Sequence, residues 1–413
     1  MIKKIVGFIL NQFRQVHKEG LPILFNKLRR FPLLILAIPI VFLVRILRPI
    51  LVVRFRHLYS ERIGHFALDT EIYLCERDAG IHGQRILDIF YFLDYFSISN
   101  AQLKKMWGRT LHIWSFARWI AQVNSYLPGS KKHIIQFRRH QDRDIHGLLA
   151  YTQPHLSFTP EEERIGFNAL RKLGIPQEYN FICFYARDSS YLDITFPDTN
   201  WGYHNYRNDN IHNFIPAAEE LTRRGYFAIR MGTTVKDALK ITNPRIIDYA
   251  LKGRSDFLDI FLGAKCQFCL YNPAGLSAIP MIFRRPIVFV DCIPLEYVVT
   301  YSSNSLFIPK KLWLQKDKRF LTFREILDSG IGRFLYTEQY EKSGIEVVQN
   351  TPEEITAVAI EMDERLKGNW QTTREDEELQ QRFWSFFKPS ELNQVFLSRI
   401  GTEFLRQNIN LLE

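Results

Sequence analysis

Cysteine is scarce in this chain, with five residues among 413. An odd number of thinly spaced cysteines inside apolar stretches does not match the framework of a disulfide-stabilised secreted domain, so we expect reduced core thiols in a cytoplasmic protein. Cys266 and Cys269 have the gap of a metal-binding pair, but no second pair accompanies them. Because both fall in a predicted strand, where this spacing directs side chains to opposite faces, we expect no zinc site.

The motifs of several common enzyme classes are missing. The chain has no Walker loop, no GxGxxG, no HExxH and no nucleophile elbow, which argues against P-loop hydrolases, dinucleotide enzymes, HExxH zinc proteases and α/β-hydrolases. Asp142 and Asp144 have DxD spacing, but they do not follow a predicted strand in a way suited to a metal-bound nucleotide diphosphate. We therefore expect neither a metal nor another cofactor.

Acidic residues are nearly absent from the start of the chain. Residues 1–56 contain eleven of the 54 basic residues and one of the 44 acidic residues, which leaves 43 of each sign in the rest. The whole net charge of +10 therefore lies in this segment. A basic segment on a neutral body predicts contact with an anionic membrane surface and no nucleic-acid partner.

The same segment lacks a full membrane span. Its charge-free apolar run covers residues 31–44, whereas a spanning helix needs about 20 apolar residues. Arg45 and Arg48 interrupt the run before it resumes at 50–53, and apolar residues recur at helical spacing through 2–30. We expect residues 1–56 to be a membrane-associating segment, inserted peripherally or monotopically, and leave open whether 31–53 spans the bilayer. The alternative is two amphipathic helices packed on the body.

The body shows the alternation of an α/β protein. Thr159 and Pro160, followed by three glutamates, predict a helix start. After a linker at 175–179, apolar strand segments at 181–185, 226–231, 268–271 and 287–290 alternate with helices at 214–224, 257–264 and 276–283. The sequence predicts two Rossmann-like domains facing a cleft, at 57–175 and 176–370, and C-terminal helices at 371–413.

A turn at 272–277 follows one of these strands and precedes a helix. Backbone N–H groups at such a turn can hold a diphosphate. Gly275 would permit close approach of the phosphates, and Ser277 would add a hydroxyl donor. The candidate donor-binding residues in this turn are Asn272, Gly275, Leu276 and Ser277. A plain strand-to-helix turn remains the alternative, since one glycine is a weak motif.

Arginines and a long loop add to this candidate site. Arg187 follows the strand at 181–185 and Arg230 lies inside AIRMG near the end of the strand at 226–231, where a phosphate partner is plausible. Either could instead form a structural ion pair with Asp188 or Asp237. The loop at 188–210 is long, polar and aromatic, which favours binding. Its candidate residues are Tyr206, Arg207 and Asn208.

A candidate base lies in the first predicted domain. Gly64 permits a sharp turn after the first strand, at 54–58, and His65 would stand at the carboxyl end of that strand. A neutral imidazole there could take a proton from an acceptor hydroxyl. Asp69 and Glu71 are the alternates, and for any single histidine taken alone a structural role is favoured over a catalytic one.

These stretches resemble a family of bacterial glycosyltransferases of surface polysaccharide biosynthesis. The resemblance covers about residues 57–370, and its most specific parts are RIGHFALDTEIYLCERD (62–78), FYARDSSY (184–191), HNYRNDNI (204–211), RRGYFAIRMG (223–232), DYA (248–250) and SDFLDIFLGAKCQFCLYNPAGLSAIPMIFRRP (255–286). More distantly the layout is similar to the heptosyltransferase type of the glycosyltransferase B fold. That type has an aspartate base in an RIGD-like turn and a DSGL-like turn for the donor diphosphate. This chain has His65 at the place of that aspartate and the 272–277 turn at the place of the donor turn.

The resemblance implies a reaction class without a substrate. We expect a metal-independent glycosyltransferase that moves a sugar from a nucleotide sugar to a glycan or lipid-linked glycan acceptor. It would act at the cytoplasmic face of the bacterial inner membrane. The alternatives are a nucleotide-sugar 2-epimerase, which has less need of a membrane segment, and a non-catalytic scaffold of a polysaccharide assembly complex.

Overall fold

The computed structural model describes the backbone of residues 21–413 except 177, 179 and 196, together with their side chains except those of 21–30 and 192. The helical pattern expected before residue 21 lies outside these residues. The chain forms two compact units. Among the described residues, unit 1 comprises 21–62, 76–99 and 104–139, and unit 2 comprises 63–75, 100–103 and those from 140 to 413. The units therefore do not divide at the expected linker near 175, because the segment that contains His65 packs with the C-terminal part of the chain.

Unit 1 is built on two parallel strands, β1 (Val52–His57) and β2 (Ile86–Tyr91). Isolated bridges pair Phe55 with Ile134 and Phe90 with Ile113. The helices α2 (Leu21–Ile46), α5 (Ala117–Ser125) and most of α4 (Ala101–Thr110) complete the unit. The expectation of a second full Rossmann-like domain at 57–175 is thus met only by this small parallel pair.

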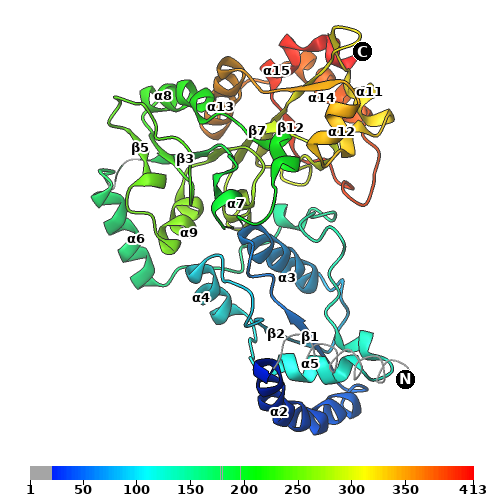
Figure 1. Ribbon diagram of the computed structural model, residues 1–413. Coiled ribbons are helices and arrows are strands. Elements are labelled where there is room, and N and C mark those ends of the chain that lie inside the picture. The colour runs from blue at the N-terminus through cyan, green and yellow to red at the C-terminus, as the bar shows by residue number, and fades with distance from the viewer. Residues whose placement is uncertain (1–20, 177, 179, 196) are drawn as a thin grey trace. The chain divides into compact units, whose positions relative to one another are not determined.

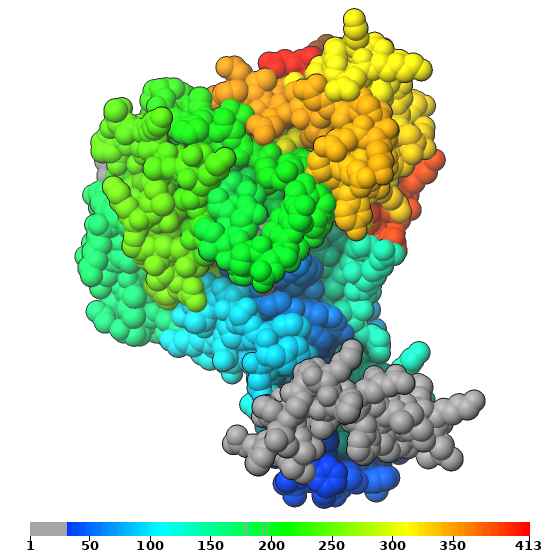
Figure 2. Space-filling view, viewed as in Figure 1, coloured from blue at the N-terminus to red at the C-terminus, as the bar shows by residue number. Residues whose placement is uncertain are grey.

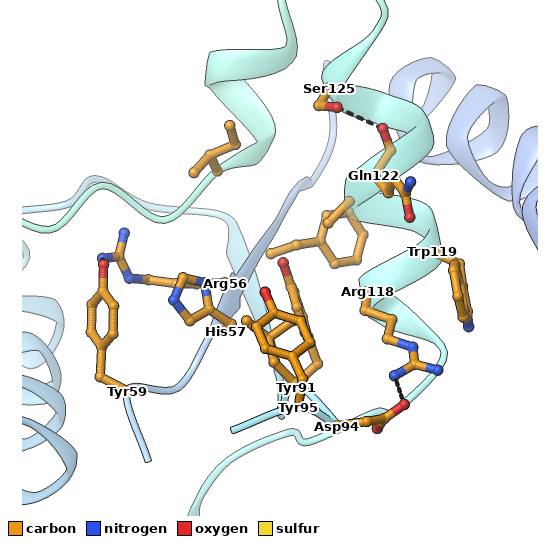
Figure 3. A pocket seen from close by; sticks show the side chains of 14 residues that line it. Arg56, His57, Tyr59, Tyr91, Asp94, Tyr95, Arg118, Trp119, Gln122 and Ser125 are labelled. Atoms are coloured by element: carbon orange, nitrogen blue, oxygen red, sulfur yellow. Dashed lines mark hydrogen bonds and ion pairs between the residues drawn. The ribbon is translucent and has the colours of Figure 1, made fainter. Parts of the chain in front are cut away.

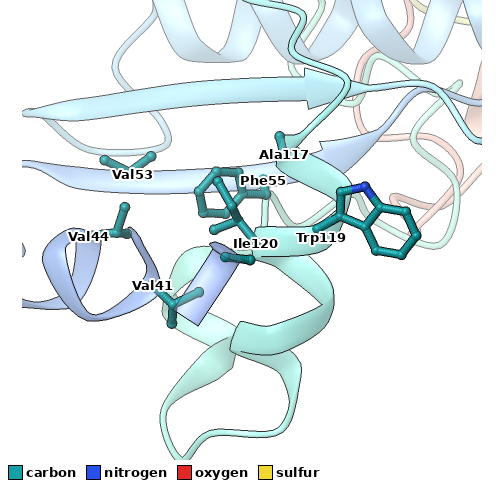
Figure 4. Close-up of a cluster of buried hydrophobic side chains, with 8 residues drawn as sticks. Val41, Val44, Val53, Phe55, Ala117, Trp119 and Ile120 are labelled. Atoms are coloured by element: carbon teal, nitrogen blue, oxygen red, sulfur yellow. The ribbon is translucent and has the colours of Figure 1, made fainter. Parts of the chain in front are cut away.

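One face of α2 forms part of the core of unit 1. Figure 4 shows this core, where α2 packs on β1 and α5 through Ala37, Val41, Val44, Val53, Phe55, Ala117, Trp119 and Ile120. The Arg45 guanidinium donates to the Asn124 side-chain oxygen at 2.8 and 3.1 Å, which ties the end of α2 to α5. The alternative interpretation, in which amphipathic helices pack on the body, is therefore confirmed in part, since α2 packs on β1 and α5.

The other face of α2 is apolar and exposed. Its large exposed side chains are Phe31, Ile35, Leu36, Ile38, Phe42, Leu43 and Ile46. A soluble amphipathic helix would place polar residues on this face. Among the described helices, none has an apolar stretch long enough to cross a bilayer.

Unit 2 contains a seven-stranded sheet in which every neighbouring pair is parallel. The order is β12-β8-β7-β6-β3-β4-β5 (Figure 1). The bounds are β3 (Phe181–Tyr185), β4 (Phe227–Arg230), β5 (Ile246–Asp248), β6 (Cys269–Tyr271), β7 (Ile287–Cys292), β8 (Ser305–Pro309) and β12 (Arg399–Ile400). Counted from β3 outward, the order reverses between β3 and β6, as in a doubly wound Rossmann-type sheet. This confirms the α/β architecture expected for the C-terminal domain.

Helices accompany these strands, most of them near the places expected from the sequence, and one short helix, Ser190–Thr195, lies in the segment predicted as a loop. They are α6 (Pro160–Lys172), α7 (Ser190–Thr195), α8 (Ile215–Arg223), α9 (Asp256–Lys265), α10 (Ala278–Ile282), α13 (Pro352–Leu366), α14 (Arg374–Ser385) and α15 (Thr402–Gln407). Thr159 caps α6 in a capping box with Glu162, as its sequence predicts. The segment from β8 to α13 also forms an antiparallel sheet that was not expected. It contains β9 (Lys311–Leu314), β10 (Arg319–Phe320) and β11 (Ile345–Val348), with α11 (Phe323–Asp328) and α12 (Thr337–Lys342).

Candidate functional site

The site of interest lies where the strand order of the large sheet reverses. In doubly wound sheets, ligands bind beyond the carboxyl ends of the strands at this switch point. Arg187 lies two residues after the end of β3, and Asn272 directly follows β6. The backbone N–H of Arg187 donates to the Asn272 side-chain oxygen at 2.8 Å. Two residues predicted from separate motifs therefore meet at the switch point.

The aromatic loop predicted at 188–210 packs against the same switch point of the large sheet. Figure 2 shows the loop near residue 200, in green, on the surface of unit 2. The Arg207 guanidinium donates to the Pro273 carbonyl oxygen at 3.1 Å, and the Asn272 amide donates to the Arg207 carbonyl oxygen at 3.2 Å. The Arg187 guanidinium donates to the Asn208 side-chain oxygen. Arg207 and Asn208 thus join the turn that follows β6.

A buried ion pair between Lys310 and Asp209 supports this loop. Lys310 Nζ lies 2.6 Å from Asp209 Oδ1, and both side chains are almost fully buried. Lys310 also donates to the carbonyl oxygens of Tyr206 and Asn208, at 3.1 and 3.0 Å. Burial raises the pKa of Asp209 to about 6, although Lys310 and Asn272 act in the opposite direction. Lys310 was missed by the sequence reasoning, and its signal was a lysine directly after the apolar strand SLFIP.

Two guanidinium groups at this site, those of Arg187 and Arg207, have no carboxylate within ion-pair distance in the part of the chain that the structure describes. Burial lowers the pKa of Arg187, and the positive charge of Arg207 lowers it further, whereas the carboxylate of Asp209, which is itself paired with Lys310, acts in the opposite direction. Two guanidinium groups held close enough to repel each other form a site that an anion such as a phosphate would stabilise.

The turn after β6 is shorter and more closed than its sequence predicts. Residues Gly275–Ser277 form a 3-10 turn that leads into the five-residue helix α10. The Ser277 hydroxyl donates to the Ala274 carbonyl oxygen at 2.6 Å, and Ser277 is buried. Its proton is therefore used within the turn. Gly275 is exposed and Leu276 is half-buried.

The segment that carries His65 touches this turn within unit 2. Gly64 precedes a π-helical turn, His65–Asp69, which continues into α3 (Thr70–Asp78). A Cβ atom added to Gly64 would lie 2.9 Å from the Cα of Gly275. Only glycine permits this approach. The two turns predicted as the base and the donor site are therefore in backbone contact.

His65 and Asp69 form a pair with the geometry of a base and its orienting group. His65 Nδ1 lies 3.2 Å from Asp69 Oδ2 and 3.3 Å from Oδ1. The His65 side chain is 48% exposed, whereas that of Asp69 is 7% exposed. If the carboxylate accepts the Nδ1 proton, the neutral ring carries its lone pair on Nε2, which is the tautomer required of a general base. Asp69 is thus placed as the partner of His65.

Glu71, the other alternate base, has a structural place. It is fully buried, and its Oε1 atom lies 2.7 Å from the Arg284 guanidinium and 3.1 Å from His155 Nδ1. Arg284 adopts a left-handed backbone conformation with φ of 58°. The ion pair of Glu71 and Arg284 joins α3 to the residues that follow α10. A carboxylate buried in this way is not placed to meet a substrate, which argues against the predicted role of Glu71.

Arg230 and Tyr206 are likewise buried rather than open to a ligand. Arg230 is 2% exposed, lies 3.2 Å from Asp248 Oδ2 and donates to the Asp237 carbonyl oxygen. Its structural alternative is therefore favoured, with Asp248 as the charged partner. Tyr206 is buried against Tyr340, with ring centroids 5.3 Å apart, and so supports the loop.

Unit 1 contains a separate pocket with a volume of about 630 Å³. It lies beside the last residues of β1 and β2, His57 and Tyr91, and beside α5 (Figure 3). Its polar and aromatic lining comprises Arg56, His57, Tyr59, Tyr91, Asp94, Tyr95, Arg118, Trp119, Gln122 and Ser125. Burial lowers the pKa of His57, and the positive charge of Arg56 lowers it further, which favours a neutral imidazole. No sequence motif predicted this pocket.

Neither a protein-family model nor a curated protein matches the chain. Solved structures similar to it include a glycosyl transferase family 9 protein from Veillonella parvula, with 10% identity, a TM-score of 0.43, and coverage of 77% of this chain and 97% of that one. The ADP-heptose lps heptosyltransferase II of E. coli has 12% identity, a TM-score of 0.36, and coverage of 62% and 90%. An E. coli heptosyltransferase with ADP has 12% identity, a TM-score of 0.28, and coverage of 70% and 99%. All three TM-scores lie below 0.5, so the proposals below rest on the residues of this chain.

Proposed function

We propose that this protein is a glycosyltransferase that moves a sugar from a nucleotide-activated donor to a glycan acceptor at a membrane. The observation that carries the proposal is the arrangement at the switch point of the large sheet. There, Arg187 and Arg207 form no ion pair with a carboxylate among the described residues and flank a turn that touches the His65 turn. This combines an anion site with a candidate base in one unit.

The donor diphosphate would bind beside the two arginines. During transfer, the bond between the anomeric carbon and the diphosphate breaks, and negative charge develops on the leaving group. Arg187 and Arg207 would stabilise that charge, which is the largest single contribution that a site of this kind makes to the rate. Because these guanidinium groups supply the positive charge, the proposal includes independence from a divalent metal.

His65 would receive the proton of the acceptor hydroxyl. The acceptor oxygen forms the new bond to the anomeric carbon as its proton passes to Nε2 of the imidazole. Asp69 would stabilise the resulting imidazolium through Nδ1, 3.2 Å away. Asp69 is therefore a positioning residue, and His65 is the catalytic residue of the proposal.

The pocket of unit 1 would bind a saccharide. Its aromatic rings offer flat apolar faces to the C–H groups of a sugar ring, and its polar groups offer hydrogen-bond partners to the hydroxyls. Tyr95 is 75% exposed, so the pocket is open to solvent at that side chain. The pocket belongs to unit 1 and the donor site to unit 2.

The membrane surface would be bound by α2. The exposed apolar side chains of 31–46 would enter the interface between headgroups and acyl chains, and the basic residues of 1–30 together with Arg48 would bind anionic lipids. The proposed location is the cytoplasmic face of the bacterial inner membrane, with peripheral or monotopic attachment. A lipid-linked acceptor would then lie at the surface to which the enzyme is bound.

The donor site can be tested by a thermal-shift screen with nucleoside diphosphates and nucleotide sugars, with and without EDTA. We expect one nucleotide to raise the melting temperature equally in both conditions, since a ligand of the native state stabilises it by mass action. Arg207→Gln should lose the shift, whereas the exposed Arg223→Gln should retain it. The absence of a shift with every nucleotide, or an equal shift in Arg207→Gln, would refute the donor site. A shift that EDTA abolishes would refute metal independence.

Turnover separates this proposal from its rivals. Sugar transfer from the bound nucleotide sugar to a glycan acceptor supports it. Epimerisation of the nucleotide sugar without an acceptor supports a 2-epimerase instead, and binding without turnover on a broad acceptor panel supports a scaffold.

Membrane binding can be tested by co-sedimentation with phosphatidylglycerol vesicles and with phosphatidylcholine vesicles. We expect binding to the anionic vesicles, and a loss of at least tenfold in Leu36→Glu and Phe42→Glu. Ile165→Glu is the matched control, because Ile165 is an exposed apolar residue on α6 of unit 2. Equal binding of all variants would refute a role for α2.

A further inference from the structure

Three buried cysteines converge inside unit 2. Cys183 on β3 and Cys269 on β6 are paired in the register of these neighbouring parallel strands. The sulfur atoms of Cys183, Cys266 and Cys269 all lie within 4.8 Å of one another, and those of Cys266 and Cys269 are 3.4 Å apart. The expectation that Cys266 and Cys269 point to opposite faces is therefore wrong. Its premise fails because Cys266 lies before β6 and caps the C-terminus of α9.

The three sulfur atoms have nearly the spacing of a metal site. With Zn–S bonds of about 2.3 Å, tetrahedral sulfur ligands lie about 3.8 Å apart. Spacings between 3.4 and 4.8 Å reach this value through sub-ångström movements. All three cysteines have zero exposure, so a bound ion would be enclosed by protein.

A fourth polar group points to the same ligand. Tyr271 is fully buried, and its hydroxyl oxygen has no hydrogen-bond partner among the described residues. Tyr271 lies two residues after Cys269 on β6, so the two side chains project from the same face of the sheet. A buried hydroxyl without a partner costs free energy, and binding to an ion would satisfy it.

The charges around the cluster favour a divalent ion. Arg285 brings a positive charge to this end of α9, where its guanidinium donates to the Ala264 carbonyl oxygen at 2.7 Å. Three thiolates around a divalent cation carry one net negative charge, which Arg285 would balance. A monovalent ion would leave an uncompensated buried charge, and such charges are costly.

We propose that Cys183, Cys266 and Cys269 form a structural site for Zn²⁺, with the Tyr271 hydroxyl oxygen as the fourth group. The ion would join β3, β6 and the end of α9. Arg187 and Asn272 follow β3 and β6 closely along the chain, so the ion would fix the strands that carry the switch-point residues. The site is independent of the proposed transfer chemistry, and its ion would enter during folding, as in other structural zinc sites.

Metal analysis of the full-length protein tests this directly. Protein purified without chelators or a metal-binding tag should contain about one zinc per chain by plasma mass spectrometry. Protein refolded with Co²⁺ should show the absorption bands of thiolate-to-cobalt charge transfer. These two measurements need no variant. A protein that lacks zinc as purified and takes up neither ion on refolding would overturn the proposal, as would copper in place of zinc or a Cys266–Cys269 disulfide in the peptide map.

Variants then assign the ligands. Cys266→Ser and Cys269→Ser should each lower the zinc content at least fivefold. Cys292→Ser is the matched control, since Cys292 is a buried cysteine of β7 outside the cluster, and it should keep the full content. Zinc retained in both cluster variants would contradict the assignment.

Discussion

The backbone of Gly64 lies directly against the backbone of Gly275, 211 positions later in the chain. A Cβ atom on Gly64 would meet the Cα of Gly275 at 2.9 Å and its carbonyl oxygen at 3.4 Å. Real Cβ atoms do not approach other backbone atoms so closely. The backbone of Gly64 has ordinary right-handed helical angles, with φ of −62° and ψ of −52°. Glycine is thus required here by contact and not by conformation.

Substitution of Gly64 by alanine should destabilise the protein through this contact alone. We expect the free energy of unfolding to fall by about 1 to 3 kcal/mol, the usual cost of forcing atoms into a packed site. Gly275→Ala should cost less, because its nearest neighbours would be the Gly64 nitrogen at 3.3 Å and the Ile63 side chain at 3.4 Å. Urea unfolding monitored by circular dichroism measures both.

Gly108→Ala is the control for these two variants. Gly108 lies inside α4, and a Cβ atom there would meet nothing within 4 Å. Alanine is favoured over glycine in a helix by about 1 kcal/mol, so this variant should be neutral or more stable. If Gly64→Ala is as stable as Gly108→Ala, the two turns are not in contact in solution.

The pair of His65 and Asp69 predicts that substitution of either residue lowers kcat but leaves nucleotide binding unchanged. His65→Ala should lower kcat by about 10²- to 10⁴-fold, the range for loss of a general base. Asp69→Asn should also lower kcat, since an amide can donate to Nδ1 and stabilise the wrong tautomer. The nucleotide-induced thermal shift should persist in both, because neither residue belongs to the anion site.

His146→Ala controls for the loss of an imidazole, because His146 is an exposed histidine of the same unit. It should retain the wild-type kcat. A His65→Ala variant with the wild-type rate on the true acceptor would remove His65 from the reaction.

The alternation of strands and helices in unit 2 was predictable, because strands buried on both faces are read as short apolar runs. Strand positions such as 181–185 and 268–271 accordingly match β3 and β6 closely. The strand order was not predictable, since it depends on pairings between distant segments. The division into units was missed for the same reason. Residues 63–75 follow β1 in the chain but pack through pairs such as Glu71 and Arg284, 213 positions apart.

The candidate site was likewise predictable from the sequence only in part. Arg187, Arg207 and Asn272 were found because each belongs to a local strand-end or loop pattern. Their mutual contacts, and the support from Lys310, depend on positions up to about a hundred residues apart. The role of Arg230 could not be resolved from sequence, because an arginine at a strand end can bind a phosphate ligand or pair with a buried carboxylate of the protein. The role of Glu71 could not be resolved either, because the sequence does not show whether its carboxylate is buried. Only the burial of each group separates the two cases.

Arg230 and Arg207 should therefore have opposite phenotypes. Arg230→Gln removes the partner of the largely buried Asp248, so the free energy of unfolding should fall by about 3 kcal/mol. The folded fraction should still bind the nucleotide. Arg207→Gln should leave stability within about 0.5 kcal/mol of wild type and lose the nucleotide. Parallel urea unfolding and calorimetric titration would show both effects, and a stable Arg230→Gln variant that cannot bind the nucleotide would return Arg230 to the donor site.

Asp259 makes stability depend on pH in a predictable direction. This carboxyl on α9 is 2% exposed, and burial raises its pKa from 3.8 to about 6, against the opposing effects of Arg254 and Tyr249. Between these two values the folded state binds more protons at this group than the unfolded state does. The free energy of unfolding contributed by Asp259 must therefore fall as the pH rises from about 4 to 6.

Comparison with Asp259→Asn isolates this contribution, because asparagine does not titrate. The stability of wild type relative to the variant should be highest near pH 4 and should decrease by on the order of 3 kcal/mol by pH 7, since each pKa unit corresponds to about 1.4 kcal/mol. Urea unfolding of both proteins at intervals of half a pH unit measures the difference, and other titrating groups cancel in it. A difference that increases with pH would mean that the ion pair with Arg254, 2.6 Å away, outweighs the burial of the carboxylate.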